Sequence, residues 1–326
     1  MIRPTAFLAA ASLLCLAAAH ARALDCAKAN SPTDKAICAA PAARAADDSM
    51  AAAYRVLFKR LAAPQRHGLA LTQLEWLHRR DFACQGDADE GACLARFTRS
   101  RADLLAARPE AGPGTPDPLA PTFVGQAGRM GVTDVRISSL RFSPARGAGE
   151  ADFNAAMDAI EKDVPRPTKD DFNRDKFAFQ SDVRIAYASP ALLSVHQSGY
   201  QYSGGAHPTS SATDVNVDLA RGRKLTGGDL LGPAGLRAVA RICTRSIADE
   251  KAKRLQSPAP TGDELAKLGK DVAATMAHLT SWSFGADAAT VTFDPYSVGS
   301  YAEGFYECRL PYAALKPLAK PDFPLP

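Results

Sequence analysis

The cysteines of this 326-residue chain constrain its fold more than any other feature. Beyond residue 23 they form a group of four early in the chain and a pair near its end: Cys26, Cys38, Cys84 and Cys93, then Cys243 and Cys308. Both groups are even in number, which is typical of chains that form disulfides in an oxidising compartment. A zinc site is disfavoured because no two of these cysteines have the close spacing of zinc-ligand pairs. We therefore predict disulfides within each group.

Residues 1–23 have the parts of a secretory signal. Arg3 is followed by an apolar run over residues 6–19 and by a small-residue pattern that ends at Ala23. This predicts export to the periplasm or the exterior, with cleavage after Ala23. A lipoprotein signal anchored at Cys15 is disfavoured because Leu14 stands where such signals carry a small residue. No later segment has about 18 consecutive apolar residues, so we expect no transmembrane segment in the mature chain.

The charge balance argues against one class of partner. The formal net charge is +4, and removal of a leader that contains Arg3 and Arg22 lowers it to +2. This value is too small to favour nucleic acid or an anionic surface as the partner, and the arginines are scattered rather than arranged in a stripe. With 46% hydrophobic and 23% charged residues, the chain is expected to be globular.

A proline-rich stretch divides the chain into two parts. Residues 108–121 contain five prolines, which predicts a semi-rigid, extended linker and a domain boundary. Residues 24–107 have helical periodicity, whereas residues 122–326 mix strand-like alternation with helices. The chain is therefore predicted to be α+β, with a disulfide-stapled helical bundle followed by a domain of antiparallel sheet and helices.

The first domain is predicted to be an antiparallel bundle. Met50, Tyr54 and Leu57 lie on one helical stripe, and similar stripes pass through Trp76 and Leu94. Short links between these segments make the helices antiparallel neighbours. In this tracing the early cysteines lie at one end of the bundle.

Four cysteines allow three connectivities. Of these we favour Cys26 with Cys84 and Cys38 with Cys93. The late pair lies on a predicted helix and a predicted strand, so a bond between its members would tie the helix to the sheet.

The stretch GYQYSGGAHPTS, residues 199–210, is the first candidate binding site. Gly204 and Gly205 allow a positive φ, which predicts a tight turn after a strand. The proline after His207 biases this residue toward an extended conformation, so its ring is expected to point away from the turn. A structural hairpin whose histidine has no function is the simpler alternative. The aromatic anchors of a functional loop would be Tyr200 and Tyr202.

A second aromatic segment has the sequence TFDPYSVGSYAEGFYECRLPY and occupies residues 292–312. Gly299 and Gly304 bracket part of a loop that carries Tyr296 and Tyr301. The sequence does not decide whether these two tyrosines are packed or displayed.

No residue pattern predicts catalysis. The chain has no G-x-S-x-G or H-E-x-x-H motif, and every mature cysteine has a potential partner. His196 and His207 lack further ligands at useful spacing, which disfavours a metal site. We expect a protein without catalytic residues, metal or cofactor.

Residues 26–105 resemble the LprI-type lysozyme-inhibitor domain. The resemblance is carried by DCAKANSPTDKAICAA, DSMAAAYRVL, QLEWLHRRDFAC and CLARFTRSRADLL. It covers nearly all of the predicted helical domain. It implies an association with lysozyme.

Residues 132–318 are similar to an RsiV-like domain of unknown function. The motifs are YQYSGGAHPTSSATDVNVDLARGRKLTGGDLL and FDPYSVGSYAEGFYECRLPY. Such domains occur in an anti-sigma factor that senses lysozyme and beside a peptidoglycan deacetylase. The two resemblances together imply an exported protein that binds lysozyme and could inhibit it. The predicted glycine turn indicates a mechanism for inhibition, in which His207 donates a hydrogen bond to the catalytic carboxylates of lysozyme. A peptidoglycan-binding module that uses the four tyrosines to stack on sugars is the alternative.

Overall fold

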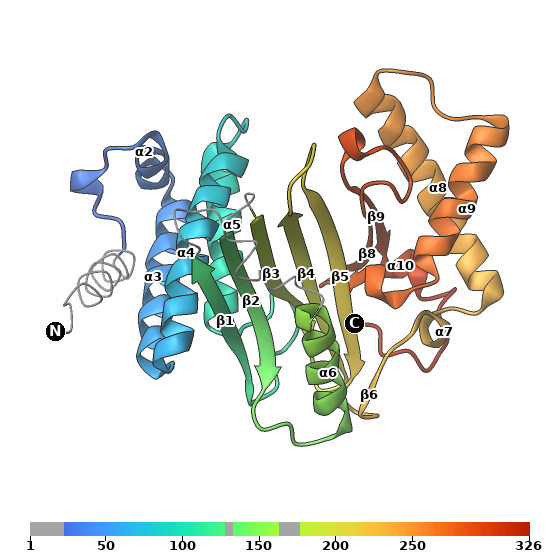
Figure 1. Cartoon of the computed structure of the whole chain (residues 1–326). Coiled ribbons are helices and arrows are strands. Elements are labelled where there is room, and N and C mark those ends of the chain that lie inside the picture. Colours follow the sequence, from blue (N-terminus) through green and yellow to red (C-terminus); the bar gives the residue numbers. More distant parts are fainter. Residues whose placement is uncertain (1–22, 128–132, 163–176) are drawn as a thin grey trace. The chain divides into compact units, whose positions relative to one another are not determined.

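The computed structural model describes residues 23–127, 133–162 and 177–326 (Figure 1). The chain divides into two compact units, which are described one at a time. Unit 1 comprises the described residues of Met1–Arg108 and Pro121–Ser138, and unit 2 those of Pro109–Ala120 and Ser139–Pro326. The predicted leader lies outside the described residues except for Ala23. The helices of unit 1 and the antiparallel sheets of unit 2 confirm the predicted α+β class.

Unit 1 is built from helices whose apolar faces pack together. Its helices are η1 (Cys26–Lys28), α2 (Pro32–Ala39), α3 (Pro41–Arg60), α4 (Ala63–Cys84) and α5 (Glu90–Leu105). Met50, Tyr54 and Leu57 recur at three- and four-residue intervals on α3 and share a buried cluster with Trp76 of α4. Residues at this spacing occupy one helix face, so the stripes found in the sequence become the core of the bundle.

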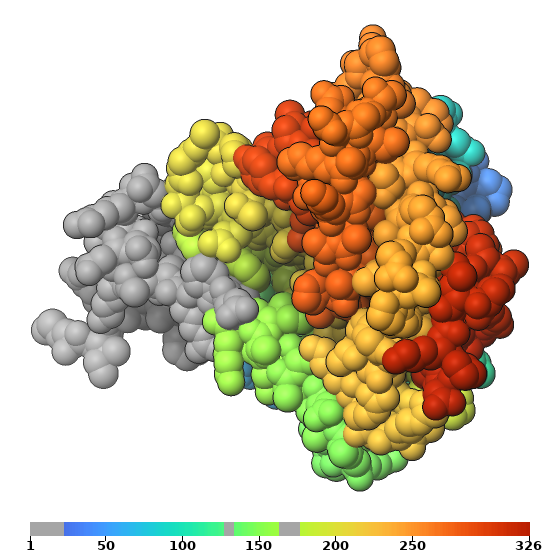
Figure 2. Space-filling view, turned by 90° about the vertical axis from the view of Figure 1, so that its right-hand side faces the viewer, coloured from blue at the N-terminus to red at the C-terminus, as the bar shows by residue number. Residues whose placement is uncertain are grey.

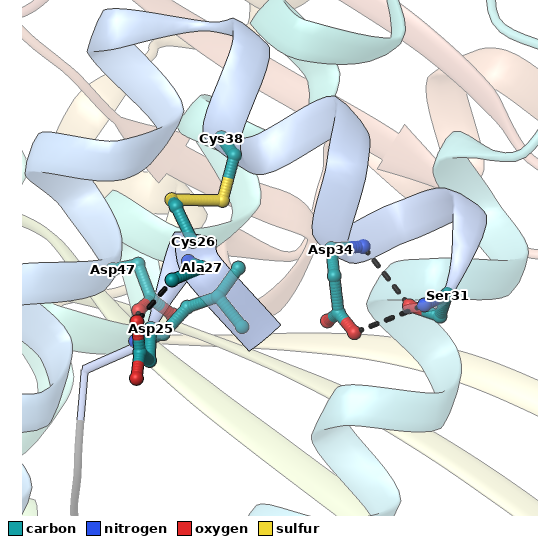
Figure 3. Close-up of a disulfide and its surroundings, with 8 residues drawn as sticks. Asp25, Cys26, Ala27, Ser31, Asp34, Cys38 and Asp47 are labelled. Carbon is teal, nitrogen blue, oxygen red and sulfur yellow. Dashed lines mark hydrogen bonds between the residues drawn. A yellow bond between two sulfur atoms is a disulfide. The ribbon is translucent and has the colours of Figure 1, made fainter. Parts of the chain in front are cut away.

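The first disulfide joins Cys26 to Cys38 and holds the N-terminal segment against α2 (Figure 3). Their Cα atoms are 5.7 Å apart. A capping box starts α2: the backbone N–H of Asp34 donates to the Ser31 hydroxyl, and the backbone N–H of Ser31 donates to the Asp34 carboxylate. The cap fixes the first turn of the helix, and with it the position of Cys38 relative to Cys26.

The second disulfide joins Cys84 to Cys93, so the predicted pairing of Cys26 with Cys84 and of Cys38 with Cys93 is wrong. The physical reason is local. Cys84 is the last residue of α4, Cys93 lies in the first turn of α5, and the short connection brings their Cα atoms to 5.5 Å. This separation is the one that a disulfide requires.

Residues 121–138 belong to unit 1 although they follow the proline-rich stretch. They hold most of β1 (Leu119–Ala127) and the first part of β2 (Thr133–Phe142). The backbone N–H of Phe123 donates to Gln65 Oε1 at 2.6 Å, and a Cβ atom at position 68 would lie only 2.5 Å from the Phe123 carbonyl oxygen. Gly68 therefore allows β1 to approach α4 at backbone distance. As a result, the two units do not coincide with the domains expected at 24–107 and 122–326.

The proline-rich stretch is docked rather than free. Its residues 109–120 cluster with unit 2. There the backbone N–H of Glu110 donates to the Ile185 carbonyl at 2.8 Å, and the N–H of Ala188 donates to the Ala111 carbonyl at 3.1 Å. The backbone groups between the prolines of the predicted linker are therefore able to pair with a strand.

Unit 2 contains an antiparallel sheet that packs on other elements at both faces. This part consists of the end of β2, α6 (Ala148–Lys162), β3 (Phe177–Ala188), β4 (Leu192–Tyr202), β5 (Thr209–Asp218) and β6 (Arg223–Lys224). Strands β3 to β6 are neighbours in chain order. The odd-numbered face of β5 meets α6, since a Cβ at Gly149 would lie 3.3 Å from Val217 Cγ1. On the even-numbered face, Asn216 Nδ2 donates to the Trp282 carbonyl at 2.8 Å.

A second sheet and two long helices complete unit 2. These elements are α7 (Gly227–Leu230), α8 (Pro233–Leu255), α9 (Gly262–Met276), η4 (Leu279–Ser281), β7 (Trp282–Phe284), β8 (Ala288–Phe293), η5 (Tyr301–Glu303), β9 (Tyr306–Pro311) and α10 (Tyr312–Leu315). β7, β8 and β9 form a three-stranded antiparallel sheet. A disulfide joins Cys243 of α8 to Cys308 of β9, which confirms the predicted bond between helix and strand.

Candidate functional site

The predicted glycine turn closes the β4–β5 hairpin. Gly204 and Gly205 have φ values of +93° and +98°, which L side chains rarely adopt. Tyr202, the last residue of β4, donates its hydroxyl to the Gly205 carbonyl at 3.1 Å. The turn is thus braced from within, and Tyr202 takes part in closing it.

His207 projects from this turn and stacks on a tyrosine from a distant part of the chain. Its exposed ring lies 3.9 Å from the Tyr301 ring, centroid to centroid, with 19° between the planes. His207 Nδ1 is 2.9 Å from the Pro208 carbonyl and Nε2 is 3.3 Å from the Tyr296 hydroxyl. A carbonyl only accepts, so Nδ1 carries a proton, and whenever the ring is neutral Nε2 accepts from the Tyr296 hydroxyl. His207, Tyr296 and Tyr301 are called the aromatic patch below.

The backbone at Tyr296 has a conformation that tyrosine does not favour. The N–H of Ser297 donates to the Asp294 carbonyl at 3.0 Å, which closes a turn with Pro295 and Tyr296 at its centre. Tyr296 has a φ of +73° and is 65% exposed. A proline followed by a residue with positive φ is the pattern of a type II turn, which favours glycine at the second position. Strained conformations of bulky residues concentrate at functional sites, and this one holds an aromatic ring in solvent.

The loop over residues 294–304 is attached to the sheet at its start. Asp294 accepts a hydrogen bond from the backbone N–H of Ala212 on β5 at 2.9 Å. Burial raises the pKa of Asp294, although the bond from Ala212 acts in the opposite direction. Figure 2 shows the yellow β4–β5 end next to the orange-red segment that carries this loop. The bond places Tyr296 beside the hairpin tip.

The end of the loop is held by a network around Glu303. The Ser300 backbone N–H donates to Glu303 Oε1 at 2.6 Å, the Tyr306 hydroxyl donates to Oε2 at 2.8 Å, and Lys251 of α8 forms an ion pair with Oε2. Burial alone would raise the pKa of Glu303, but the hydrogen bonds from Lys251, Ser300 and Tyr306 outweigh it and lower the pKa to about 2. A Cβ at Gly299 would lie 2.8 Å from this pair, so glycine leaves it room.

The structure brings three of the predicted aromatic residues together and places the others elsewhere. His207 contacts Tyr296 and Tyr301, which are about ninety positions away in the chain. Tyr200 lies within β4, half-buried, opposite Gln180 and Ser210 of the neighbouring strands. The patch is therefore made by the hairpin tip and the 294–304 loop rather than by the tyrosines of β4.

His196, a metal ligand by residue type, pairs with a buried carboxylate. Its Nδ1 is 3.0 Å from Asp214 Oδ1, and burial raises the pKa of Asp214. Within the described ranges, no three His, Cys, Asp or Glu side chains gather in a way that could hold a metal ion. The helices of these ranges include none that is both long and apolar enough to cross a bilayer.

Phe82 of unit 1 is a candidate contact residue that the sequence reasoning missed. It is 83% exposed, two residues before the Cys84–Cys93 bond. A helical wheel could have found it, because Leu69, Trp76 and Cys84 are buried on one face of α4 and Phe82 falls outside that stripe. A large ring so exposed on a disulfide-stapled end has the properties of an anchor for a protein partner.

Substituting Gly205 with alanine tests the turn. The Cβ would meet no atom within 4 Å, so the effect isolates the backbone conformation at φ +98°. We expect a loss of about 1–2 kcal/mol in the free energy of unfolding, measured by urea denaturation. Gly147→Ala is the matched control, because its Cβ is equally unobstructed and its φ is not in the left-handed region. Equal effects of the two substitutions would contradict the account of the turn.

Three family models match the chain. Residues 26–105 match "Lysozyme inhibitor LprI", residues 139–210 match "Deacetylase PdaC", and residues 229–313 match "Protein of unknown function (DUF3298)". The first match lies within unit 1 and the other two lie within unit 2. No curated protein gives a significant match.

Solved structures of the DUF3298 family resemble the chain only distantly. A member from Bacteroides fragilis is 16% identical, with a TM-score of 0.45, and the match covers 62% of this chain and 93% of that one. A protein of the family from Pseudomonas aeruginosa is 20% identical, with a TM-score of 0.41, and the match covers 63% and 96%. The three family matches follow one another along the chain. They show that the chain joins an LprI-type domain to a DUF3298-type region, as its sequence motifs predicted.

Proposed function

We propose that the protein is exported to the cell envelope, where it binds and inhibits lysozyme without catalysis of its own. The observation that carries this proposal is the match of residues 26–105 to the lysozyme-inhibitor model. The PdaC and DUF3298 matches support a role at the cell wall. Three disulfides support an oxidising compartment, because such bonds persist outside the cytoplasm.

The aromatic patch is the proposed contact surface in unit 2. Lysozyme works with two carboxyl groups, of which one is kept protonated as the general acid. When His207 is neutral, the Tyr296 hydroxyl donates its proton to His207 Nε2. The phenol oxygen then accepts a hydrogen bond from the protonated carboxyl group of lysozyme. With a second proton on His207 this bond reverses, and the hydroxyl donates to the ionised carboxylate. His207 thus acts through Tyr296 rather than by direct donation.

Substituting Tyr296 with glycine separates binding from stability. Glycine adopts φ +73° without strain, so we expect unfolding stability to be retained or raised by about 1 kcal/mol. Loss of the exposed ring should weaken lysozyme binding about 30-fold, the effect of a central contact residue. Isothermal titration calorimetry against lysozyme measures the affinity, and urea denaturation measures the stability.

The matched control is Gln256→Gly. Gln256 has a φ of +50° at the C-terminal end of α8, so the substitution relieves the same kind of backbone strain away from the patch. We expect its affinity for lysozyme to equal that of the parent. If Tyr296→Gly also binds like the parent, the patch is not the contact, and loss of binding in Phe82→Ser would instead place the contact in unit 1.

A second candidate function is binding of cell-wall glycan without inhibition. The exposed ring of His207, stacked on the half-buried ring of Tyr301, favours it, because aromatic rings suit the apolar faces of sugars. Quenching of tyrosine and tryptophan fluorescence by glycan fragments, with no effect on lysozyme, would support this alternative. Absence of quenching would argue against it.

A further inference from the structure

A polar cavity lies within unit 2 on the sheet face opposite to His196. Its volume is about 310 Å³, and its walls come from β3, β4, β5 and Ile160 of α6. Gln197 pairs across β4 and β5 with Thr213, and Gly199 pairs with Ser181 and Ser211. Residues two apart on a strand share a face, so Gln197 and Gly199 face the cavity together.

Gly199 provides the floor of the cavity. A Cβ at this position would meet the Ser211 hydroxyl at 3.1 Å, and its next neighbour would be the Ser211 carbonyl oxygen at 3.9 Å. The position is an ordinary strand residue without positive φ. The absence of a side chain here keeps space open, whereas any larger residue would fill it.

Gln197 lines the cavity, and its side chain carries an unpartnered polar atom. The residue is only 4% exposed, and its Nε2 donates to the Ser181 hydroxyl. Its Oε1 is buried and accepts no hydrogen bond. A buried acceptor without a donor is unfavourable, and most such atoms in folded proteins are satisfied. A ligand that donates an O–H or N–H to Oε1 would remove this cost.

The lining defines the chemistry of that ligand. Apart from the glycine, the β4 and β5 part of the lining consists of neutral polar side chains: Gln197, Tyr200, Gln201, Thr209, Ser211 and Thr213. Phe179 and Ile160 add an aromatic and an aliphatic surface. Ligand pockets in proteins span roughly 300–1,000 Å³, so this one has the size for a single ring. Hydroxyls, two amides and two aromatic rings suit a neutral ligand with several O–H or N–H donors and an apolar face.

We propose that this cavity binds one neutral sugar residue through the side-chain amide of Gln197. Gln197 Oε1 accepts from a hydroxyl or acetamido N–H of the sugar, and Phe179 contacts the apolar side of the ring. The site is separate from the aromatic patch, and it does not depend on lysozyme binding.

The test measures the binding of N-acetylglucosamine, the probe, to the intact protein by saturation-transfer NMR and by titration. The parent should bind it, and should bind the charged sugars glucosamine and glucuronate about tenfold more weakly, because no ion in the described lining compensates their charge. Gln197→Leu removes the acceptor at similar volume, and Gly199→Val fills the floor. Each should weaken binding about tenfold or more.

Two controls keep the outcome decisive. Ser198→Ala changes an exposed residue on the opposite face of β4 and should bind as the parent does. Tyr296→Gly should also retain sugar binding, which separates this site from the aromatic patch. Thermal melting establishes that each variant is folded, and Gly199→Ala provides a milder filling variant if Gly199→Val is not. The proposal is overturned if the parent does not bind the sugar, or if folded Gln197 and Gly199 variants bind it as tightly as the parent.

Discussion

Substituting Lys251 with methionine is expected to destabilise unit 2 by about 3–5 kcal/mol and to weaken lysozyme binding as well. The Lys251 and Glu303 side chains are only 13% and 10% exposed, so the substitution leaves a largely buried carboxylate without its cation. Glu303 also caps η5 through Ser300 and accepts from Tyr306. The same network holds the loop that carries Tyr301, which is why stability and binding should fall together.

The pH dependence of this effect has a definite sign. The pKa of Glu303 in the folded protein is about 2, below its ordinary value of 4.5. A lowered pKa of an acid contributes stability that is present above the ordinary value and is lost as the pH falls toward the folded value. The difference in unfolding free energy between the parent and Lys251→Met should therefore shrink between about pH 5 and about pH 2.

Urea denaturation across this pH range measures the effect. Lys267→Met is the control, because Lys267 pairs with Asp271 one helical turn away while 78% exposed. Exposed pairs of this kind contribute only about 0.3–0.5 kcal/mol. A Lys251 substitution as mild as the Lys267 control, or one whose effect grows as the pH falls, would refute the role assigned to the network.

Removing the Cys243–Cys308 bond by substituting both residues with alanine should cost about 4 kcal/mol. The bond closes a loop with a sequence separation of 65, and both cysteines are buried, at 0% and 1% exposure. In the chain-entropy description a longer closed loop gives a larger stabilisation. The bond also ties α8 to β9 within the buried cluster that contains Trp282.

Comparison with the Cys84–Cys93 bond provides the internal reference. Its sequence separation is 9, for which the same description gives about 2.5 kcal/mol. Denaturation of the two double-alanine variants, followed by a probe in each unit, measures the two losses. A loss from the long loop no larger than the loss from the short one would contradict the loop-closure explanation.

Several parts of the fold were predictable because they depend on local patterns. The spacing of Met50, Tyr54 and Leu57 predicted a buried stripe on α3, and the structure has it. Gly204 and Gly205 predicted a turn with positive φ, which is also observed. These features follow from helical periodicity and from the conformational freedom of glycine, and both can be recognised from residues close together in the sequence.

Other features were not predictable because they depend on which segments approach each other. Helix tracing placed Cys38, Cys84 and Cys93 at one end of the bundle, but the pairing was decided by the short turn between α4 and α5. The proline-rich stretch has the composition of a linker, yet Glu110 and Ala111 pair with β3. The composition of a segment indicates how the segment behaves in isolation. It does not indicate which strand the segment will pair with in the folded protein.

The residues of the aromatic patch were singled out from the sequence, but their arrangement was not. The sequence singled out His207, Tyr296 and Tyr301, whereas their stacking requires the Asp294–Ala212 bond between distant segments. The type II turn that exposes Tyr296 carries no glycine, so the sequence did not mark the positive φ of this residue. The unpartnered Gln197 oxygen likewise becomes visible only when its neighbours on β3 and β5 are known.

The most direct test of the central proposal is the lysis of a cell-wall suspension by lysozyme in the presence of the intact, oxidised protein. Turbidity is followed while the protein concentration is raised past that of lysozyme. We expect the rate of lysis to fall saturably toward zero, and Tyr296→Gly to require about 30-fold more protein for the same inhibition. A rate of lysis that does not change at any protein concentration would contradict the proposal that this protein inhibits lysozyme.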